Sequence, residues 1–189
     1  MRILYIAQNI PTPHKSTNAV IYKIATECSR FARITFLHMV ERVPFFLRHN
    51  RKYRHLTGLS DFSWLGHYVI VREYTRIPLK GFAFALLNRV PGRLNVDKFD
   101  LCHAHYILPD GYIAYLIKKK HGIPYVVSIR SSDMKNIHGR LCDFKRAKKV
   151  IDNAERVVCL NRGQMKYIKR VFGVEGVMIP HGIDKEDLL

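Results

Sequence analysis

Short apolar runs alternate with helical patterns along most of the chain. Strands are predicted from apolar runs at residues 2–7, 34–39, 68–74, 99–104, 124–129, 156–160 and 177–179. Helices are predicted from the spacing of apolar residues at 18–31, 110–120, 141–153 and 162–172, and a further helix begins near 82–87. The alternation predicts an α/β fold, a single Rossmann-like, doubly wound and mainly parallel sheet with helices on both faces.

Length and composition agree with one globular domain. The chain has 189 residues, 48% of them hydrophobic, which excludes a disordered basic tail. No apolar run approaches the roughly 20 residues of a membrane helix, and the first residues turn polar too early for a secretory signal peptide. The four cysteines form no CxxC pair, and Cys102 and Cys159 sit inside apolar runs, which favours core positions.

The chain is strongly basic. It has 32 Lys and Arg against 15 Asp and Glu, a net charge of +17. Residues 1–95 hold 15 of the basic and 4 of the acidic residues, so most of the excess lies there. Such a surface attracts phosphates, nucleic acid or anionic lipid, and the size of the excess disfavours the alternative of a merely well-solvated face.

The predicted strand ends carry polar residues that are candidates for ligand or metal binding. Ligands of such sheets bind outside the carboxyl ends of the strands. His103 and His105 end one strand, and because alternate residues share a face, both imidazoles are expected to point the same way. With Asp133 they could ligate a metal, but two strand-end histidines in a polar cleft are the favoured interpretation, with no metal.

The next strand is followed by a cation, two hydroxyls and a carboxylate. These side chains are Arg130, Ser131, Ser132 and Asp133. They suit the recognition of a polyol or a phosphate. A helix cap explains the same pattern equally well, so both interpretations stay open.

The loop after the first strand precedes a predicted helix. Lys15, Ser16, Thr17 and Asn18 lie beside that helix N-terminus, where an anion can bind. The chain contains neither GxGxxG nor GxxxxGK[ST], which counts against a dehydrogenase or an NTPase.

A series of motifs follows in order through the second half of the chain. Residues 99–106 read Phe-Asp-Leu-Cys-His-Ala-His-Tyr, Pro109-Asp110-Gly111 follows, and residues 122–129 read Gly-Ile-Pro-Tyr-Val-Val-Ser-Ile. Residues 152–160 and the segment Ile-Pro-His-Gly-Ile-Asp at 179–184 complete the series. In order and spacing these motifs resemble glycosyltransferase family 4. The resemblance covers nearly the whole chain and is clearest from 99 to 184.

The resemblance implies two Rossmann-like domains facing across a cleft, the GT-B fold. Residues 1–180 would form the acceptor-binding domain, and residues 181–189 would begin the linker to a C-terminal donor domain that this chain lacks. The family transfers a sugar with retention from a nucleotide-diphosphate sugar, without a metal. No cofactor is then expected in this domain, which would be inactive alone.

The resemblance also suggests roles for individual residues. Arg130 stands where the family commonly has a histidine near the reacting sugar, so Arg130 and Asp133 are the expected catalytic pair. The expected acceptor contacts are His105, Tyr106, Ser131 and Ser132. The expected donor-phosphate loop is Lys15, Ser16, Thr17 and Asn18, although the family usually has two glycines there and side chains hinder a close approach of the backbone.

Residues 42–54 combine apolar and basic side chains. The resemblance implies that this region binds the acceptor, as it often does in the family, and in members that act on lipid-linked acceptors it also touches the membrane. An apolar-plus-basic composition suits anionic lipid headgroups, although a surface helix packed on the core is an alternative. The expected membrane and anion patch consists of Phe45, Phe46, Arg48, Arg51, Lys52 and Arg54.

The function expected from these observations is that of an acceptor-binding half of a glycosyltransferase. The enzyme would build a cell-surface polysaccharide or glycolipid on a glycan or lipid-linked acceptor, in the cytoplasm and peripheral to the inner face of the membrane, without nucleic acid. The alternative is a basic Rossmann-like nucleic-acid-binding module, motivated by the charge and the ten tyrosines but unsupported by a recognised motif. A metal-dependent hydrolase using His103 and His105 is a third possibility.

Overall fold

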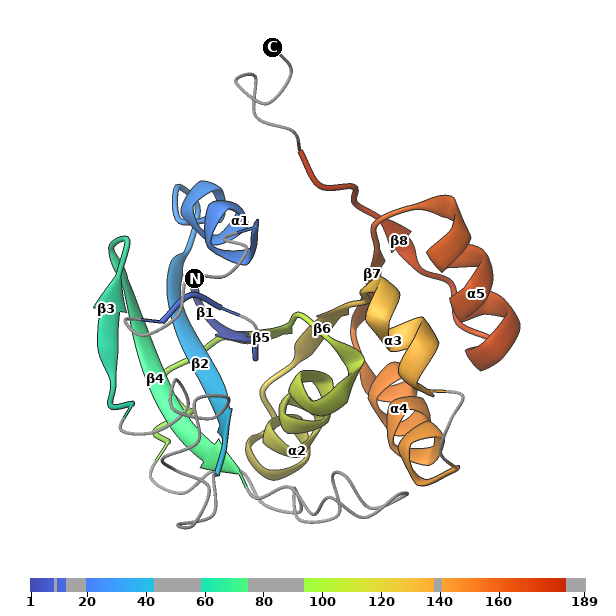
Figure 1. The fold of residues 1–189 in the computed structure, drawn as a ribbon, viewed down its shortest axis with the longest axis horizontal. Coiled ribbons are helices and arrows are strands. Elements are labelled where there is room, and N and C mark those ends of the chain that lie inside the picture. The colour runs from blue at the N-terminus through green and yellow to red at the C-terminus, as the bar shows by residue number, and fades with distance from the viewer. Residues whose placement is uncertain (9, 13–19, 43–58, 75–93, 138–140, 183–189) are drawn as a thin grey trace, which may run out of the picture.

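One eight-stranded sheet organises the molecule (Figure 1). The computed structural model describes residues 1–8, 10–12, 20–42, 59–74, 94–137 and 141–182. The strands are β1 (Arg2–Ile6), β2 (Arg33–Glu41), β3 (Phe62–Trp64), β4 (His67–Tyr74), β5 (Leu101–Ala104), β6 (Tyr125–Ser128), β7 (Arg156–Cys159) and β8 (Val177–Met178). Their order is β3-β4-β2-β1-β5-β6-β7-β8, and every neighbouring pair is parallel except β3–β4. The predicted mainly parallel sheet is confirmed.

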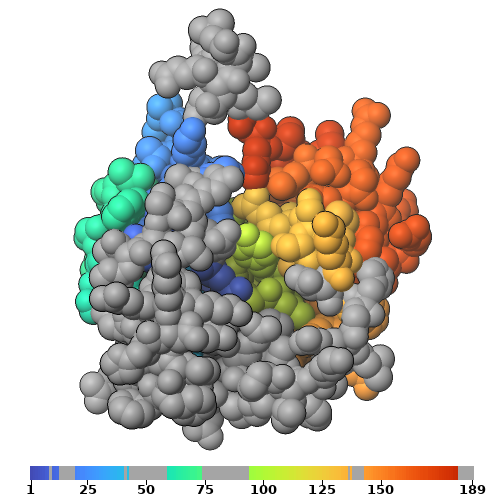
Figure 2. Space-filling model, viewed as in Figure 1, coloured from blue at the N-terminus to red at the C-terminus, as the bar shows by residue number. Residues whose placement is uncertain are grey.

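Helices cover both faces of this sheet, as predicted. They are α1 (Val20–Cys28), α2 (Tyr112–His121), α3 (Ser131–Asn136), α4 (Leu141–Asn153) and α5 (Arg162–Phe172), and an irregular turn labelled η3 (Ile107–Gly111) precedes α2. Figure 2 shows the β3–β4 hairpin and α5 at opposite borders of the molecule.

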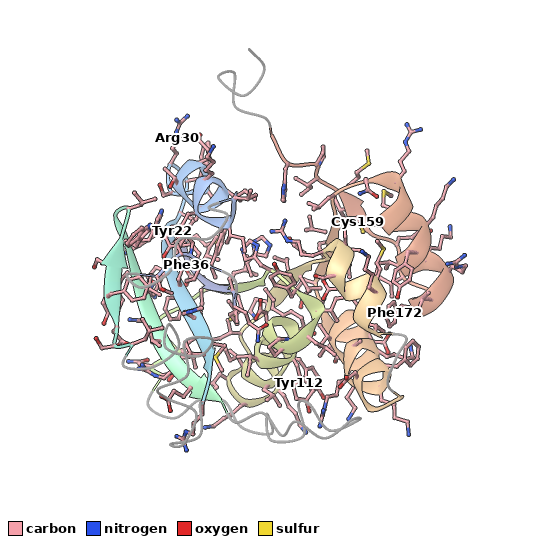
Figure 3. The ribbon with its side chains drawn as sticks, viewed as in Figure 1. Tyr22, Arg30, Phe36, Tyr112, Cys159 and Phe172 are labelled. Carbon is pink, nitrogen blue, oxygen red and sulfur yellow. The ribbon has the colours of Figure 1, made fainter. Side chains whose placement is uncertain are left out.

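Alternation along β1 explains the two faces. Leu4 and Ile6 belong to the hydrophobic cluster that includes α2, α4 and α5, whereas Ile3 and Tyr5 belong to the cluster that includes α1. Successive side chains of a strand point to opposite faces, so one apolar strand supplies both cores. On the α1 side, the ring of Tyr22 stacks on Phe36 with 4.5 Å between the centroids (Figure 3).

Most predicted elements match the structure closely. The bounds of α4 and α5 are those predicted from the sequence. Gly122 ends α2 as expected, with a left-handed φ of 73° that favours glycine. The predicted helix at 110–120 differs at its start, because η3 precedes α2 and Leu108 inside it is extended. Cys102 and Cys159 are fully buried, which confirms their core positions.

Two short elements were not predicted. Strand β3 has three residues and pairs with β4 across a tight turn at Leu65 and Gly66, both with positive φ. Helix α3 has six residues, fewer than two helical turns. Neither is long enough to show a hydrophobic period. The helix predicted near 82–87 lies outside the described residues. Among the residues that are described, none belongs to a helix both long and apolar enough to cross a bilayer.

Gly111 sits where α2 begins against the core. A Cβ there would lie 2.6 Å from Val150 Cγ1 and 3.1 Å from the Tyr106 carbonyl oxygen. We therefore expect Gly111→Ala to lower the free energy of unfolding by about 1–2 kcal/mol, measured by urea denaturation, because the added methyl group overpacks this contact. Gly182→Ala is the matched control, since a Cβ at Gly182 meets nothing within 4 Å. Equal stability of Gly111→Ala and the wild type would contradict this view of the packing.

Candidate functional site

Arg130 is the centre of a polar cluster at the carboxyl edge of the sheet. It lies two residues after the end of β6, and its guanidinium reaches two histidines. Nη2 lies 3.2 Å from His105 Nδ1, Nε donates to the His105 carbonyl oxygen at 3.3 Å, and Nη1 lies 2.6 Å from His181 Nε2. A guanidinium can only donate, so the contacted nitrogens of both imidazoles are acceptors and carry no proton.

The two strand-end histidines of β5 stack on each other. The ring centroids of His103 and His105 are 4.3 Å apart with 27° between the planes, which confirms that both imidazoles point the same way. The ring of Tyr5 lies 4.9 Å from His103 and 4.8 Å from His105. His103 Nε2 is also 2.8 Å from Ser128 Oγ on the neighbouring strand. The pair is thus fixed by its neighbours on β1 and β6.

Burial makes the three imidazoles of the cluster neutral. It lowers the pKa of His103 to about 4 and that of His105 well below its ordinary value, and the charge of Arg130 acts in the same direction. The pKa of His181 is lowered for the same two reasons. At neutral pH, Arg130 therefore carries a positive charge beside uncharged rings.

Asp133 holds the backbone that presents Arg130. Its Oδ2 accepts a hydrogen bond from the Arg130 backbone N–H at 2.8 Å, and its Oδ1 accepts one from the Ile107 N–H at 3.2 Å. The Asp133 N–H in turn donates to the Arg130 carbonyl oxygen at 3.0 Å. Asp133 is 5% exposed. Burial raises its pKa to about 7, although the backbone N–H donors act in the opposite direction. Asp133 therefore both caps α3 and belongs to the polar cluster around Arg130. The helix-cap and ligand-recognition interpretations of this segment are thus compatible.

Asp110 is a member of the site that sequence reasoning missed. It is fully buried, and its Oδ2 accepts a weak hydrogen bond from the Gln8 N–H at 3.4 Å. Its Oδ1 has no hydrogen-bond partner in the described part of the chain. Burial raises its pKa well above the ordinary value, and the nearby Asp133 carboxyl adds to the shift. The only signal in the sequence was its place in the Pro109-Asp110-Gly111 motif, because no hydrophobic period assigns a carboxyl group to the core.

The residues predicted to contact the acceptor differ in how far they are buried. His105 is 1% exposed, and its Nε2 has no partner among the described residues. Tyr106 is half-buried and packs against the cluster on the α1 face, while Ser131 and Ser132 are exposed at the start of α3. Their contacts with an acceptor stay predictions.

Two predicted groups lie outside the described residues. They are the donor-phosphate loop of Lys15, Ser16, Thr17 and Asn18, and the patch of Phe45, Phe46, Arg48, Arg51, Lys52 and Arg54. Within the described ranges, no three His, Cys, Asp or Glu residues come together in a way that could hold a metal ion.

Comparison with known proteins identifies the family. The model of glycosyltransferase family 4 matches residues 42–187, which is most of the chain. The chain belongs to glycosyltransferase family 4. The family resemblance of the motifs from 99 to 184 is thereby confirmed.

Two curated relatives agree with this assignment. The family 4 chain is 31% identical over 96 residues to an uncharacterized glycosyltransferase of Methanocaldococcus jannaschii, covering 49% of this chain and 26% of that protein. It is 29% identical over 86 residues to the putative teichuronic acid biosynthesis glycosyltransferase TuaC of Bacillus subtilis, covering 44% of this chain and 22% of that protein. The matched segments thus span about a quarter of each relative's length.

A solved structure supports the fold. The chain superposes on a structure of sucrose-phosphate synthase from Thermosynechococcus elongatus with a TM-score of 0.59, covering 100% of this chain and 93% of that one. At 14% identity this likeness concerns the fold alone. The family 4 chain therefore has the Rossmann-like architecture of one half of a GT-B fold.

Proposed function

We propose that this family 4 chain is the acceptor-binding domain of a retaining glycosyltransferase. The enzyme transfers a sugar from a nucleotide-diphosphate sugar to a glycan or lipid-linked acceptor in the synthesis of a cell-surface polysaccharide or glycolipid. The observation that carries the proposal is the Arg130 cluster at the carboxyl ends of β5 and β6, the edge where ligands of such sheets bind.

The chemistry of the cluster favours an anionic ligand group. The guanidinium of Arg130 contacts neutral nitrogens of His105 and His181, whereas the oxygens of Asp133 are bonded to backbone N–H groups. Its positive charge is therefore left to attract a phosphate of the donor or of the acceptor. A preorganised guanidinium stabilises negative charge that develops on a departing diphosphate.

The neighbouring residues take supporting roles in this proposal. Asp133 positions Arg130 by fixing the start of α3. His105 orients the guanidinium through its Nδ1 contact, because its own ring is buried and held in place. Tyr106, Ser131 and Ser132 contact the acceptor. Lys15, Ser16, Thr17 and Asn18 approach the donor phosphates.

Transfer in this proposal requires a second Rossmann-like domain that binds the donor. The sheet described above is one such domain, assigned to residues 1–180, and residues 181–189 begin the linker. The curated relatives are about four times as long as the segments they share with this chain, which supports a further domain in the complete enzyme. The nucleotide-diphosphate sugar is thus a substrate of the whole enzyme, with no cofactor in this half.

The cell-surface role rests on two observations. One relative, TuaC, is named for the biosynthesis of teichuronic acid, and the chain has a net charge of +17. We place the enzyme in the cytoplasm, peripheral to the inner face of the membrane, with the patch of residues 45–54 on anionic lipid. Each basic residue near such a surface contributes about 1 kcal/mol of attraction.

A transfer assay tests the proposed activity. The complete enzyme, supplied with a panel of nucleotide-diphosphate sugars and a lipid extract, is expected to release a nucleoside diphosphate and to form a product that keeps the anomeric configuration of the donor. The 189-residue chain alone is expected to release none. Inversion of the anomeric centre would contradict the retaining mechanism, and turnover by the chain alone would contradict the need for a second domain.

A vesicle assay tests the membrane association separately. We expect the chain to float with vesicles containing anionic phospholipid at low salt and to be released as salt is raised towards 1 M, because screening shortens the range of its charges. Neutral vesicles should bind it much less. A variant in which Arg48, Arg51, Lys52 and Arg54 are glutamine should lose the binding, and retention by that variant would contradict the proposed patch.

A further inference from the structure

A cavity lies at the opposite edge of the sheet from Arg130. Its volume is about 630 Å³, within the range of small-molecule sites. It is walled by the amino-terminal ends of β1, β2 and β4, the segment before β5 and the C-terminal end of α1. Parallel strands begin at one edge and end at the other, so this cavity is separate from the carboxyl-edge cluster (Figure 1).

The charged side chains in the lining of this cavity are all positive, although Asp100 and Asp61 bond to the lining residues Arg2 and Tyr68. Its lining residues include Arg2, Arg33 and Lys98 and contain no Asp or Glu. Arg2 is partly neutralised, because its guanidinium lies 3.9 Å from Asp100 Oδ1. Arg33 and Lys98 form no ion pair with any described residue, and the Lys98 ammonium lies 5.2 Å from the centroid of the Phe99 ring. Both charges are therefore available to an anionic group. Burial lowers the pKa of His67, which also lines the cavity and is neutral at pH 7.

Hydroxyl groups and apolar surface complete the wall. The hydroxyls come from four lining residues, Thr26, Ser29, Thr35 and Tyr68. Two of them donate to backbone carbonyls of α1, Thr26 to Tyr22 at 2.9 Å and Ser29 to Thr26 at 2.6 Å. Their oxygens retain the capacity to accept hydrogen bonds from a polyol. Leu65, 67% exposed, adds apolar surface, whereas Phe99 also lines the cavity but is only 5% exposed.

We propose that this cavity binds an anionic sugar, a monosaccharide carrying a phosphate or a carboxylate. Arg33 and Lys98 attract the anionic group, and the hydroxyls receive the ring hydroxyls of the sugar. The apolar wall, mainly the exposed side chain of Leu65, takes the less polar face of the ring. The ligand class follows from this combination, because a simple anion leaves the apolar wall without a partner and a neutral sugar leaves the cations without one.

The proposal is tested by titrating the chain with glucose 6-phosphate, glucuronate and glucose at 0.15 M salt, following backbone amide resonances. Saturable shifts at Thr26, Gly66 and Lys98 with either anion are expected, and the tighter anion identifies the preferred group. Arg33→Gln/Lys98→Gln should weaken the binding at least tenfold. Arg30→Gln is the matched control, because Arg30 at the end of α1 is not in the lining, pairs with Glu27 and points outward (Figure 3).

Three outcomes would contradict the proposed anionic-sugar site. Equal affinity of the wild type and the double variant would overturn the proposal, as would shifts spread over all basic surfaces or binding of glucose as tight as that of the anions. The replaced side chains are exposed, so the double variant should keep the unfolding temperature of the wild type, and a weakened affinity then reports the site rather than the fold.

Discussion

We expect replacement of Arg130 by glutamine to lower kcat/KM for sugar transfer by the complete enzyme about 10²–10³-fold. This is the size typical of removing one preorganised group that stabilises developing negative charge. Glutamine fills part of the space and still donates a hydrogen bond, but it carries no charge. The neutral His105 and His181 on either side supply none in its place. Initial rates of nucleotide release at several donor concentrations give the value.

Two further variants make this result specific. Arg130→Lys keeps the positive charge but loses the planar fork that reaches His105 and His181 together, so we expect an intermediate loss of activity. Arg30→Gln removes an exposed arginine just after α1 and should leave transfer unchanged. If Arg130→Gln transferred sugar at the wild-type rate while keeping its fold, the guanidinium would have no part in the reaction.

We expect replacement of Asp133 by asparagine to change how stability depends on pH. Burial raises the pKa of Asp133 to about 7 in the folded protein, from an ordinary value of 3.8 in the unfolded chain. Between these values the folded protein holds a proton that the unfolded chain has lost, so this residue makes the wild type less stable as pH rises. Asparagine has no such proton. The free energy of unfolding of Asp133→Asn relative to the wild type should therefore rise by about 2–3 kcal/mol from pH 5 to pH 8.

The comparison with the wild type removes other titrations from this measurement. Buried histidines act in the opposite direction: the pKa of His103 is lowered to about 4, so its contribution to stability is lost as pH falls below 6.5. That contribution is present in both proteins and cancels in the difference, which urea denaturation at each pH gives. Asp152→Asn, which removes an exposed carboxylate paired with Lys148, should show no such trend. A flat difference for Asp133→Asn would mean that the carboxylate stays ionised in the fold.

The sheet and its long helices were predictable because hydrophobic periodicity records burial. The runs that became β1, β6 and β7, and the periods of α4 and α5, come from residues whose side chains face a core. Helix α3 and strand β3 were not predictable in this way, because each is too short to show a period.

The candidate site was predictable in its parts but not in its connections. Alternation along a strand predicts that His103 and His105 share a face, and both stack as expected. The sequence contains no signal that Arg130 reaches His181, 51 positions away, or that Asp110 is fully buried. Such contacts depend on how the strand ends converge in three dimensions. The residues at 15–18 and 45–54 remain predictions, since they lie outside the described part of the chain.

The central claim is that Arg130 binds an anionic group of a substrate at the carboxyl edge of the sheet. It is tested most directly by an experimental structure of the complete enzyme with its nucleotide-diphosphate sugar and acceptor. We predict a phosphate oxygen of one of them within about 3 Å of an Arg130 guanidinium nitrogen, the distance of a charge-assisted hydrogen bond. A complex in which both substrates are bound and Arg130 contacts only His105, His181 and other protein groups would contradict the claim.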